Sequence, residues 1–208
     1  MKLYFSADLH LSHSNILKYC NRPWLKKGDL TKHGSWKTPE LAKKRVRQMN
    51  NDLVKNFNSV IKADDFVIHN GDFCFKNSVG GKLGEGELDK SYDHIKKFNG
   101  IWTFVAGNHD KNNSLKTKIA SLIIKFGNLD YFVVHDPKDL NPNYAVNLVG
   151  HVHNSWKIKE VIIKNRTILL YNVGVDVHNF YPVSMDKIVA EIQKWKKING
   201  KKEKTRLS

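Results

Sequence analysis

Short apolar runs alternate with segments of helical periodicity over the first half of the chain. The runs over 2–6, 66–70 and 101–105 are rich in β-branched and aromatic residues, so each predicts a buried strand. Apolar side chains recur at helical spacing over 39–61 behind Pro39, which predicts a long helix with proline in its first turn. Further helices are predicted over 15–20, 88–98, 114–121 and 185–195.

The second half of the chain is dominated by strands. We predict strands over 122–126, 131–134, 146–149, 157–163 and 166–171. Because helices alternate with strands early and strands cluster late, the pattern predicts an α/β fold with helices flanking two packed mixed sheets. We expect one domain over 1–195 and a basic, disordered tail over 196–208.

Two segments lack either periodicity and are predicted to be loops. Residues 24–38 are polar and basic, whereas residues 77–86 are rich in glycine. The glycine-rich segment follows Asp72 and would lie over any site at that position. A mobile loop is the favoured interpretation, and a lid over the site is the alternative.

The overall composition is ordinary for a globular protein, since 40% of the 208 residues are hydrophobic and 26% are charged. No apolar run approaches the roughly 20 residues of a membrane helix, and the apolar start is too short for a signal peptide. We therefore expect a cytoplasmic protein with no membrane contact. Cys20 and Cys74 are expected to be buried free thiols and not a disulfide or a zinc site.

The net charge of +15 favours an anionic partner or substrate. Residues 18–47 carry a net charge of +8, and residues 194–208 carry +6. Contact with nucleic acid and a merely solvated basic surface both explain this excess. Trp24 and Trp36, which lie among these charges, could stack on bases or anchor a loop.

Polar clusters follow the predicted strands, at the positions where ligands bind in open α/β sheets. The clusters are Asp8-x-His10, Gly71-Asp72, Gly107-Asn108-His109-Asp110, His135 and Gly150-His151-x-His153. Two carboxylates, one amide and four imidazoles suffice for two adjacent metal sites, and one imidazole is left for proton transfer. Glycine before Asp72, Asn108 and His151 allows a close backbone approach or a positive φ.

In this order, the clusters resemble the pattern of calcineurin-like metallophosphoesterases, and most closely that of the small bacterial and phage members. The resemblance covers nearly the whole chain except about the last dozen residues. Further segments that carry it are Asp8–Ile16 (DLHLSHSNI), Asn21-Arg22-Pro23, Asn58-Ser59-Val60, Asp64-Asp65, Asn70–Phe73 and Asn172–Asp176 (NVGVD). It implies a calcineurin-like αββα sandwich and a hydrolase acting on phosphate esters.

The resemblance also implies a binuclear metal centre bridged by Asp72. One ion would be bound by Asp8, His10, Asp72 and His153, and the other by Asp72, Asn108, His135 and His151. A bridging carboxylate would hold the ions about 3.5–4 Å apart, and a hydroxide shared by them would attack phosphorus in line. Nitrogen and oxygen ligands suit Mn, Fe, Zn, Ni or Mg, and the large number of ligands favours Mn or Fe, with Mn as our prediction.

His109 is the histidine of the clusters that is not used in ligation, so we predict that it protonates the leaving alkoxide. Asp110 is expected to orient the His109 imidazole. Asp136, directly after His135, would add negative charge near the second metal.

Three residues are candidates for contact with the substrate: Arg22, His13 and Asn108. Arg22 is the best candidate for a bidentate phosphate clamp, and a surface arginine before a turn proline is the alternative. His13 would contact phosphate or, alternatively, support the start of a helix. Among the other histidines, His69 is expected in the core and His94 at the surface.

The sequence therefore predicts a binuclear metal-dependent phosphoesterase, with nucleotide or nucleic-acid type substrates favoured. The alternative from another functional class is a non-catalytic, basic nucleic-acid-binding protein on the same scaffold. The choice between monoesters and diesters and the oligomeric state are left open by the sequence.

Overall fold

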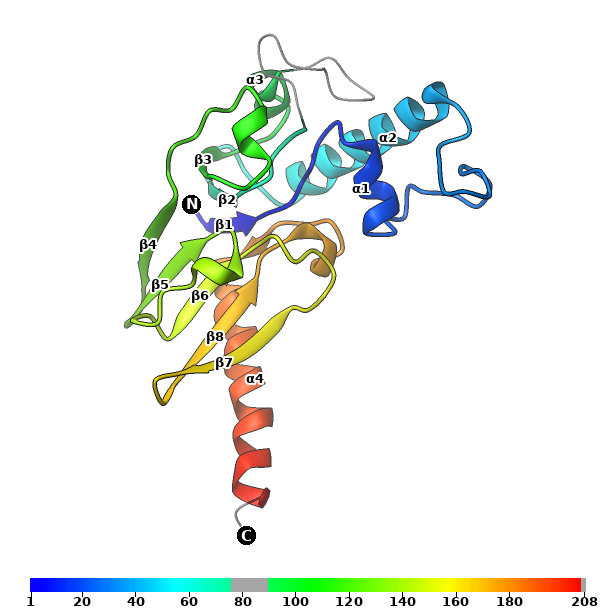
Figure 1. Ribbon diagram of the computed structural model, residues 1–208. Helices are drawn as coiled ribbons and strands as arrows, with labels where there is room; N and C mark the ends of the chain where they lie inside the picture. The colour runs from blue at the N-terminus through cyan, green and yellow to red at the C-terminus, as the bar shows by residue number, and fades with distance from the viewer. Residues whose placement is uncertain (76–89, 207–208) are drawn as a thin grey trace.

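Two β-sheets lie at the centre of the protein, with helices around them (Figure 1). The computed structural model describes residues 1–75 and 90–206, so the predicted glycine-rich loop over 77–86 lies outside the described residues. Both sheets contain parallel and antiparallel strand pairs, which confirms the predicted pair of mixed sheets.

The first sheet has four strands in the order β3-β2-β1-β9. Their bounds are β1 Leu3–Ser6, β2 Phe66–Asn70, β3 Ile101–Val105 and β9 Val183–Ser184. Strands β1, β2 and β3 are parallel, and β9 pairs with β1 in the antiparallel direction. The loops that follow the three parallel strands therefore leave the sheet at the same edge.

The second sheet has five strands in the order β4-β5-β6-β8-β7. Their bounds are β4 Ser121–Phe126, β5 Leu129–Val134, β6 Val146–Val149, β7 Ile158–Ile163 and β8 Arg166–Asn172. Strands β5, β6 and β8 are parallel to one another. Strands β7 and β8 form the predicted hairpin, and the loops after β5 and β6 leave this sheet side by side.

Four α-helices complete the described fold: α1 Ser14–Tyr19, α2 Pro39–Asn58, α3 Ser91–Ile95 and α4 Met185–Arg206. Helix α2 starts as predicted, because the Thr38 hydroxyl accepts a hydrogen bond from the Leu41 amide while Pro39 needs no amide partner. The apolar face of α2, with Met49, Leu53 and Phe57, packs with the first sheet.

A second apolar cluster lies between the two sheets. Phe5 and Val105 of the first sheet pack there with Val133 and Leu148 of the second sheet, and all four side chains are fully buried. The first turns of α4 close this cluster with Ile188. Because strands of both sheets are anchored in one core, the loops at their ends are held in fixed relative positions.

The predicted helix over 114–121 is not formed. A single 3₁₀ turn, Asp110–Asn112, is followed by an irregular segment that leads into β4. Lys116 has a φ of 53°, which interrupts an α-helix, and the Thr117 hydroxyl donates to the carbonyl oxygen of Phe104. The prediction was wrong because this segment bonds to the neighbouring strand β3.

The structure extends α4 to Arg206, past the predicted end at Trp195. Figure 1 shows this last part of the helix projecting away from the sheets. The predicted helix end at Trp195 was therefore placed too early. Lysine, glutamate and isoleucine have adequate helix propensity, and no proline follows Pro182 to stop the helix.

Within the described residues, no helix combines the length and the apolar character needed to cross a bilayer.

His69 and His94, which the sequence placed outside the metal site, are both buried. His69 lies in β2 with its Nδ1 atom 2.9 Å from the Ser6 hydroxyl, as the prediction of a core histidine requires. His94 was predicted at the surface, but only 1% of its side chain is exposed, and Nε2 lies 3.2 Å from the Ser12 hydroxyl. That prediction was wrong because α3 packs this face of His94 against the loop after β1.

His69 is expected to make the metal-free protein sensitive to acid. Burial lowers the pKa of His69 from 6.5 to about 3, so the unfolded chain takes up a proton that the folded protein excludes. The contribution of His69 to stability is therefore complete above about pH 6.5, and below that pH it falls by about 1.4 kcal/mol per pH unit. The free energy of unfolding would be measured by urea titration in the presence of a chelator. We expect His69→Leu to be less stable than the wild type near pH 7.5, but to lose less stability than the wild type when the pH is lowered to about 5.5. The exposed-site variant His33→Ala should keep the wild-type pH slope, and an unchanged slope in His69→Leu would contradict the assignment.

Candidate metal centre

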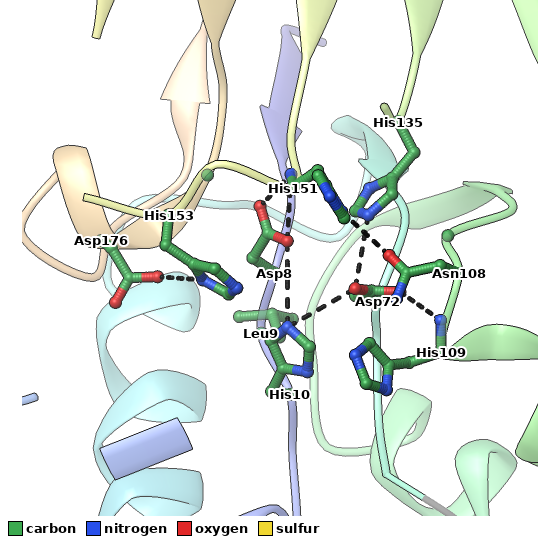
Figure 2. A network of polar contacts seen from close by, with 12 residues as sticks. Asp8, Leu9, His10, Asp72, Asn108, His109, His135, His151, His153 and Asp176 are labelled. Atoms are coloured by element: carbon green, nitrogen blue, oxygen red, sulfur yellow. Dashed lines mark hydrogen bonds and ion pairs between the residues drawn. The ribbon is translucent and has the colours of Figure 1, made fainter. Parts of the chain in front are cut away.

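Five loops bring the predicted metal ligands together at one edge of the two sheets. The loops follow β1, β2, β3, β5 and β6, and they carry respectively Asp8 with His10, Asp72, Asn108, His135, and His151 with His153. Figure 2 shows these side chains pointing toward a common centre. The strand order explains this convergence, since parallel neighbouring strands end together within each sheet.

Five of these ligand residues have a left-handed backbone. The φ angles are 59° at Asp8, 49° at His10, 59° at Asp72, 69° at His151 and 47° at His153. Asp and His adopt this region more readily than β-branched residues do. Each positive φ turns the chain sharply, which allows side chains two positions apart to reach the same centre.

The predicted ligand atoms form two groups, and the atoms within each group lie within 4.8 Å of one another. A third group that meets this limit, Cys20, His153 and Asp176, shares His153 with the first. The first group is Asp8, His10 and His153, and the second is Asp72, His135 and His151. Asp72 Oδ2 lies 3.3 Å from His135 Nε2 and 3.6 Å from His10 Nε2, so one carboxylate oxygen reaches both groups. Asn108 belongs beside the second group, because its Oδ1 atom lies 2.9 Å from His151 Nδ1.

Buried nitrogen atoms in this cluster have no hydrogen-bond partner in the described part of the chain. These atoms are Nδ1 and Nε2 of His10 and Nε2 of His135. A buried polar atom without a partner is costly unless another group satisfies it. Cations coordinated by His10 Nε2 and His135 Nε2, which both lie beside Asp72 Oδ2, would satisfy these two nitrogens, so the residues present fit a binuclear metal centre.

The local charges shift several pKa values in this cluster. Burial raises the pKa of Asp8 and lowers that of His10 well below its ordinary value. Burial opposes the charged forms of Asp72 and His135 too, but their mutual contact outweighs it. The pKa of Asp72 is therefore lowered, and that of His135 is raised to about 9. A proton on His135 and a cation compete for the same carboxylate, so metal affinity should rise with pH.

Glycine is required at two positions around Asp72. A Cβ atom at Gly107 would lie 2.2 Å from Asp72 Oδ1, and one at Gly71, whose φ is 90°, would lie 2.2 Å from His135 Nδ1. Real Cβ atoms do not approach other atoms this closely. The two glycines therefore let the loops after β2 and β3 close around the carboxylate, as the sequence predicted.

His109 lies next to the cluster but outside the two ligand groups. Its backbone amide donates to Asp72 Oδ1 at 2.8 Å, and its half-buried ring lies 5.2 Å from the ring of His10. The backbone contact fixes the position of His109 while the side chain remains free to meet another molecule.

The role predicted for Asp110 is wrong. Its carboxylate accepts hydrogen bonds from the backbone amides of Asp72, Phe73 and Gly107, and from the Asn113 side chain, at 2.7–3.1 Å. Among the described residues, no contact joins this carboxylate to the His109 ring. Asp110 instead connects the loop after β3 to the loop after β2 by hydrogen bonds. The prediction failed because it was based on the position of Asp110 next to His109 in the sequence.

The prediction of Arg22 as a phosphate clamp is also wrong. Only 1% of Arg22 is exposed, and its guanidinium is bonded to the Asp176 carboxylate and to the carbonyl oxygens of Asp8 and Leu9. With its donors occupied inside the protein, it cannot reach a substrate.

His13, the third candidate for substrate contact, lies beside the cluster. Its ring stacks on Phe75 with 3.9 Å between centroids and lies 6.1 Å from the ring of His109. Burial lowers the pKa of His13 to about 3, so the imidazole is neutral and brings no positive charge to a phosphate.

Two site residues were not singled out from the sequence. Asp176 Oδ2 lies 3.1 Å from His153 Nδ1, and the carbonyl oxygen of Asn70 lies 2.7 Å from His135 Nδ1. Both lie within segments quoted for the resemblance, NVGVD and Asn70–Phe73. An acidic residue or a carbonyl within reach of a ligating histidine is the usual support for such a ligand, and that signal could have drawn attention to Asp176.

Comparison with known proteins gives concordant results. A family model described as calcineurin-like phosphoesterase matches residues 1–206. An uncharacterized protein of Methanocaldococcus jannaschii is 29% identical over 199 residues, which are 94% of this chain and 93% of that protein. A crystal structure of a protein of unknown function from Aquifex aeolicus is similar with a TM-score of 0.57 and 20% identity, over 91% of this chain and 98% of that chain. The last likeness supports the fold.

Proposed function

Because this chain belongs to the calcineurin-like phosphoesterase family, we propose that it hydrolyses phosphate esters with two divalent cations. The observation that carries this proposal is the position of Asp72 Oδ2 between His10 Nε2 and His135 Nε2. The cations would be bound by the two groups described above, Asp8, His10, Asp72 and His153, and Asp72, Asn108, His135 and His151. Nitrogen and oxygen donors suit several divalent metals, and the four protein ligands for each ion favour manganese or iron, with manganese as the proposed metal.

The bound cations would supply an activated water and would neutralise charge on the phosphoryl oxygens. The chain itself supplies fixed geometry. The His151 amide donates to Asp8 at 2.9 Å, and the His109 amide donates to Asp72 at 2.8 Å. Because the carboxylates are held by backbone atoms of other loops, little reorganisation is needed when a substrate arrives.

His109 is proposed as the general acid. Its ring lies at the edge of the cluster and is partly open to solvent, where a leaving oxygen would depart. A ring N–H of His109 would give its proton to that oxygen as the P–O bond breaks. Asn108 and His13 flank this position and are proposed to donate hydrogen bonds to the phosphoryl group.

Nucleotide or nucleic-acid substrates are favoured by the distribution of charge. Segment 18–47 follows the loop of Asp8 and His10 and carries a net charge of +8, with Lys26, Lys27 and Lys43 exposed. The Trp24 side chain, in contrast, is buried and donates to Asp52 at 2.6 Å, so it anchors the loop and does not stack on bases. The exposed lysines would attract a polyanion without reading its sequence.

The test is a hydrolysis screen with metal-depleted protein. p-Nitrophenyl phosphate, bis-p-nitrophenyl phosphate, nucleotides and single-stranded oligonucleotides would be assayed with Mn, Fe, Zn, Ni and Mg. We expect hydrolysis that requires an added metal, is greatest with Mn and is abolished by a chelator. Absence of turnover with every metal, together with salt-dependent binding of the oligonucleotides, would contradict this proposal and favour the non-catalytic alternative.

A further inference from the structure

We propose that Arg22 and Asp176 form a buried clamp that fixes the His153 ring and the loop of Asp8 for the first cation. This inference rests on the proposed function, since it assigns two positioning residues to the same centre. Neither residue faces the substrate, and they are separated by 154 positions in the sequence.

The first half of the clamp is a bidentate ion pair. Arg22 Nε donates to Asp176 Oδ1 at 2.8 Å, and Nη2 donates to Oδ2 at 2.9 Å. Both side chains are almost completely shielded from solvent, with 0% and 2% exposed. Two parallel bonds fix the plane of the carboxylate as well as its position.

The second half of the clamp is the contact of Arg22 with the ligand loop. Nη1 donates to the carbonyl oxygen of Leu9 at 2.9 Å, and Nη2 donates to that of Asp8 at 2.6 Å. These carbonyls lie between the two ligands Asp8 and His10, in the stretch with left-handed φ angles. Arg22 therefore bonds the strained turn that presents these ligands, and its removal would leave these buried carbonyl oxygens without those donors.

The Asp176 carboxylate, which is held in place by Arg22, contacts the His153 ring. Its Oδ2 atom lies 3.1 Å from His153 Nδ1, as Figure 2 shows. A carboxylate paired with arginine can only accept hydrogen bonds, so His153 Nδ1 must carry the proton. This tautomer leaves the lone pair on Nε2, so Nε2 is the ring nitrogen that can coordinate a cation.

The chain contains a matched pair that serves as a control. Arg45 Nε lies 2.8 Å from Asp29 Oδ2, and Arg45 Nη2 lies 3.0 Å from Asp29 Oδ1. The geometry is the same bidentate one, but among the described residues the Asp29 carboxylate accepts hydrogen bonds only from the Arg45 side chain and the Lys26 amide. Asp29→Asn therefore removes an equivalent ion pair that does not support a candidate ligand.

The experiment compares Asp176→Asn, Arg22→Lys and Asp29→Asn with the wild type. Binding of Mn would be titrated by electron paramagnetic resonance, which distinguishes a coupled pair of ions from a single ion, and unfolding would be followed with a chelator present. We expect Asp176→Asn to weaken one of the two Mn ions by about 10- to 100-fold and to change the other by less than about 3-fold. Arg22→Lys should weaken the same ion, and Asp29→Asn should leave both ions unchanged.

Three results separate the possible failures. A wild-type protein that binds no Mn pair would overturn the proposed function itself. A wild type that binds the pair, together with Asp176→Asn that binds it equally well or loses both ions equally, would overturn the clamp and leave the function intact. If the variants do not fold, the clamp can still be tested on the wild type by ¹⁵N spectra of its histidines. The clamp requires that His153 is protonated at Nδ1, and an Nε2–H tautomer would refute it.

Discussion

Asp72→Asn is expected to lower phosphoester hydrolysis by about a thousandfold, equivalent to about 4 kcal/mol of transition-state stabilisation, and to reduce the bound metal from two ions to fewer than one. The reason is that Oδ2 of this residue lies within 3.6 Å of a nitrogen in each ligand group. An asparagine side chain has one oxygen and no charge, so it cannot bridge two cations while accepting the His109 amide at 2.8 Å.

The measurement combines metal analysis with the turnover of a diester substrate. Asp130→Asn is the matched control, because Asp130 is an exposed carboxylate in β5, away from the ligand loops. It should keep both ions and full activity. An Asp72→Asn protein that folds, holds two ions and turns over at the wild-type rate would show that Asp72 does not bridge.

His109→Ala is expected to have a large effect that depends on the leaving group. Loss of a general acid costs about 10²- to 10⁴-fold when the leaving alkoxide is basic, as with a nucleoside, and much less with p-nitrophenolate, which leaves without protonation. Metal content should remain at two ions, because the contact of residue 109 with Asp72 is made by its backbone amide and survives truncation of the side chain.

His33→Ala, which removes an exposed histidine from the loop before α2 that belongs to neither ligand group, provides the control for expression and purity. A His109→Ala protein that loses metal would identify His109 as a ligand. Equal losses with both leaving groups would likewise contradict proton donation, since the effect would then act on a step common to both substrates.

The strands and the ligand clusters were predicted from the sequence for a physical reason. Each cluster follows a short apolar strand, and parallel strands with buried neighbours leave few places where several polar side chains can gather. The local pattern thus carried information about a site that is assembled from five separate loops.

The errors concern interactions between distant segments. Arg22 was assigned to the substrate because its chemistry suits phosphate, whereas its partner Asp176 lies 154 positions away. His94 was placed at the surface, yet the fold packs it against Ser12. Asp110 was assigned by adjacency to His109, although its carboxylate accepts from three backbone amides. In each case the deciding partner is set by tertiary packing, which no local pattern encodes.

The left-handed backbone at Asp8, His10, Asp72, His151 and His153 has a consequence for how this chain can evolve. If these residues bind metal as proposed, a side chain at these positions must satisfy both coordination and a conformation that valine, isoleucine and threonine strongly avoid. A descendant in which the proposed metal binding was no longer selected would still be confined by the second requirement. Asparagine and glycine would therefore replace these residues during such a drift far more often than β-branched ones, and a former metal centre would remain recognisable from its turns alone.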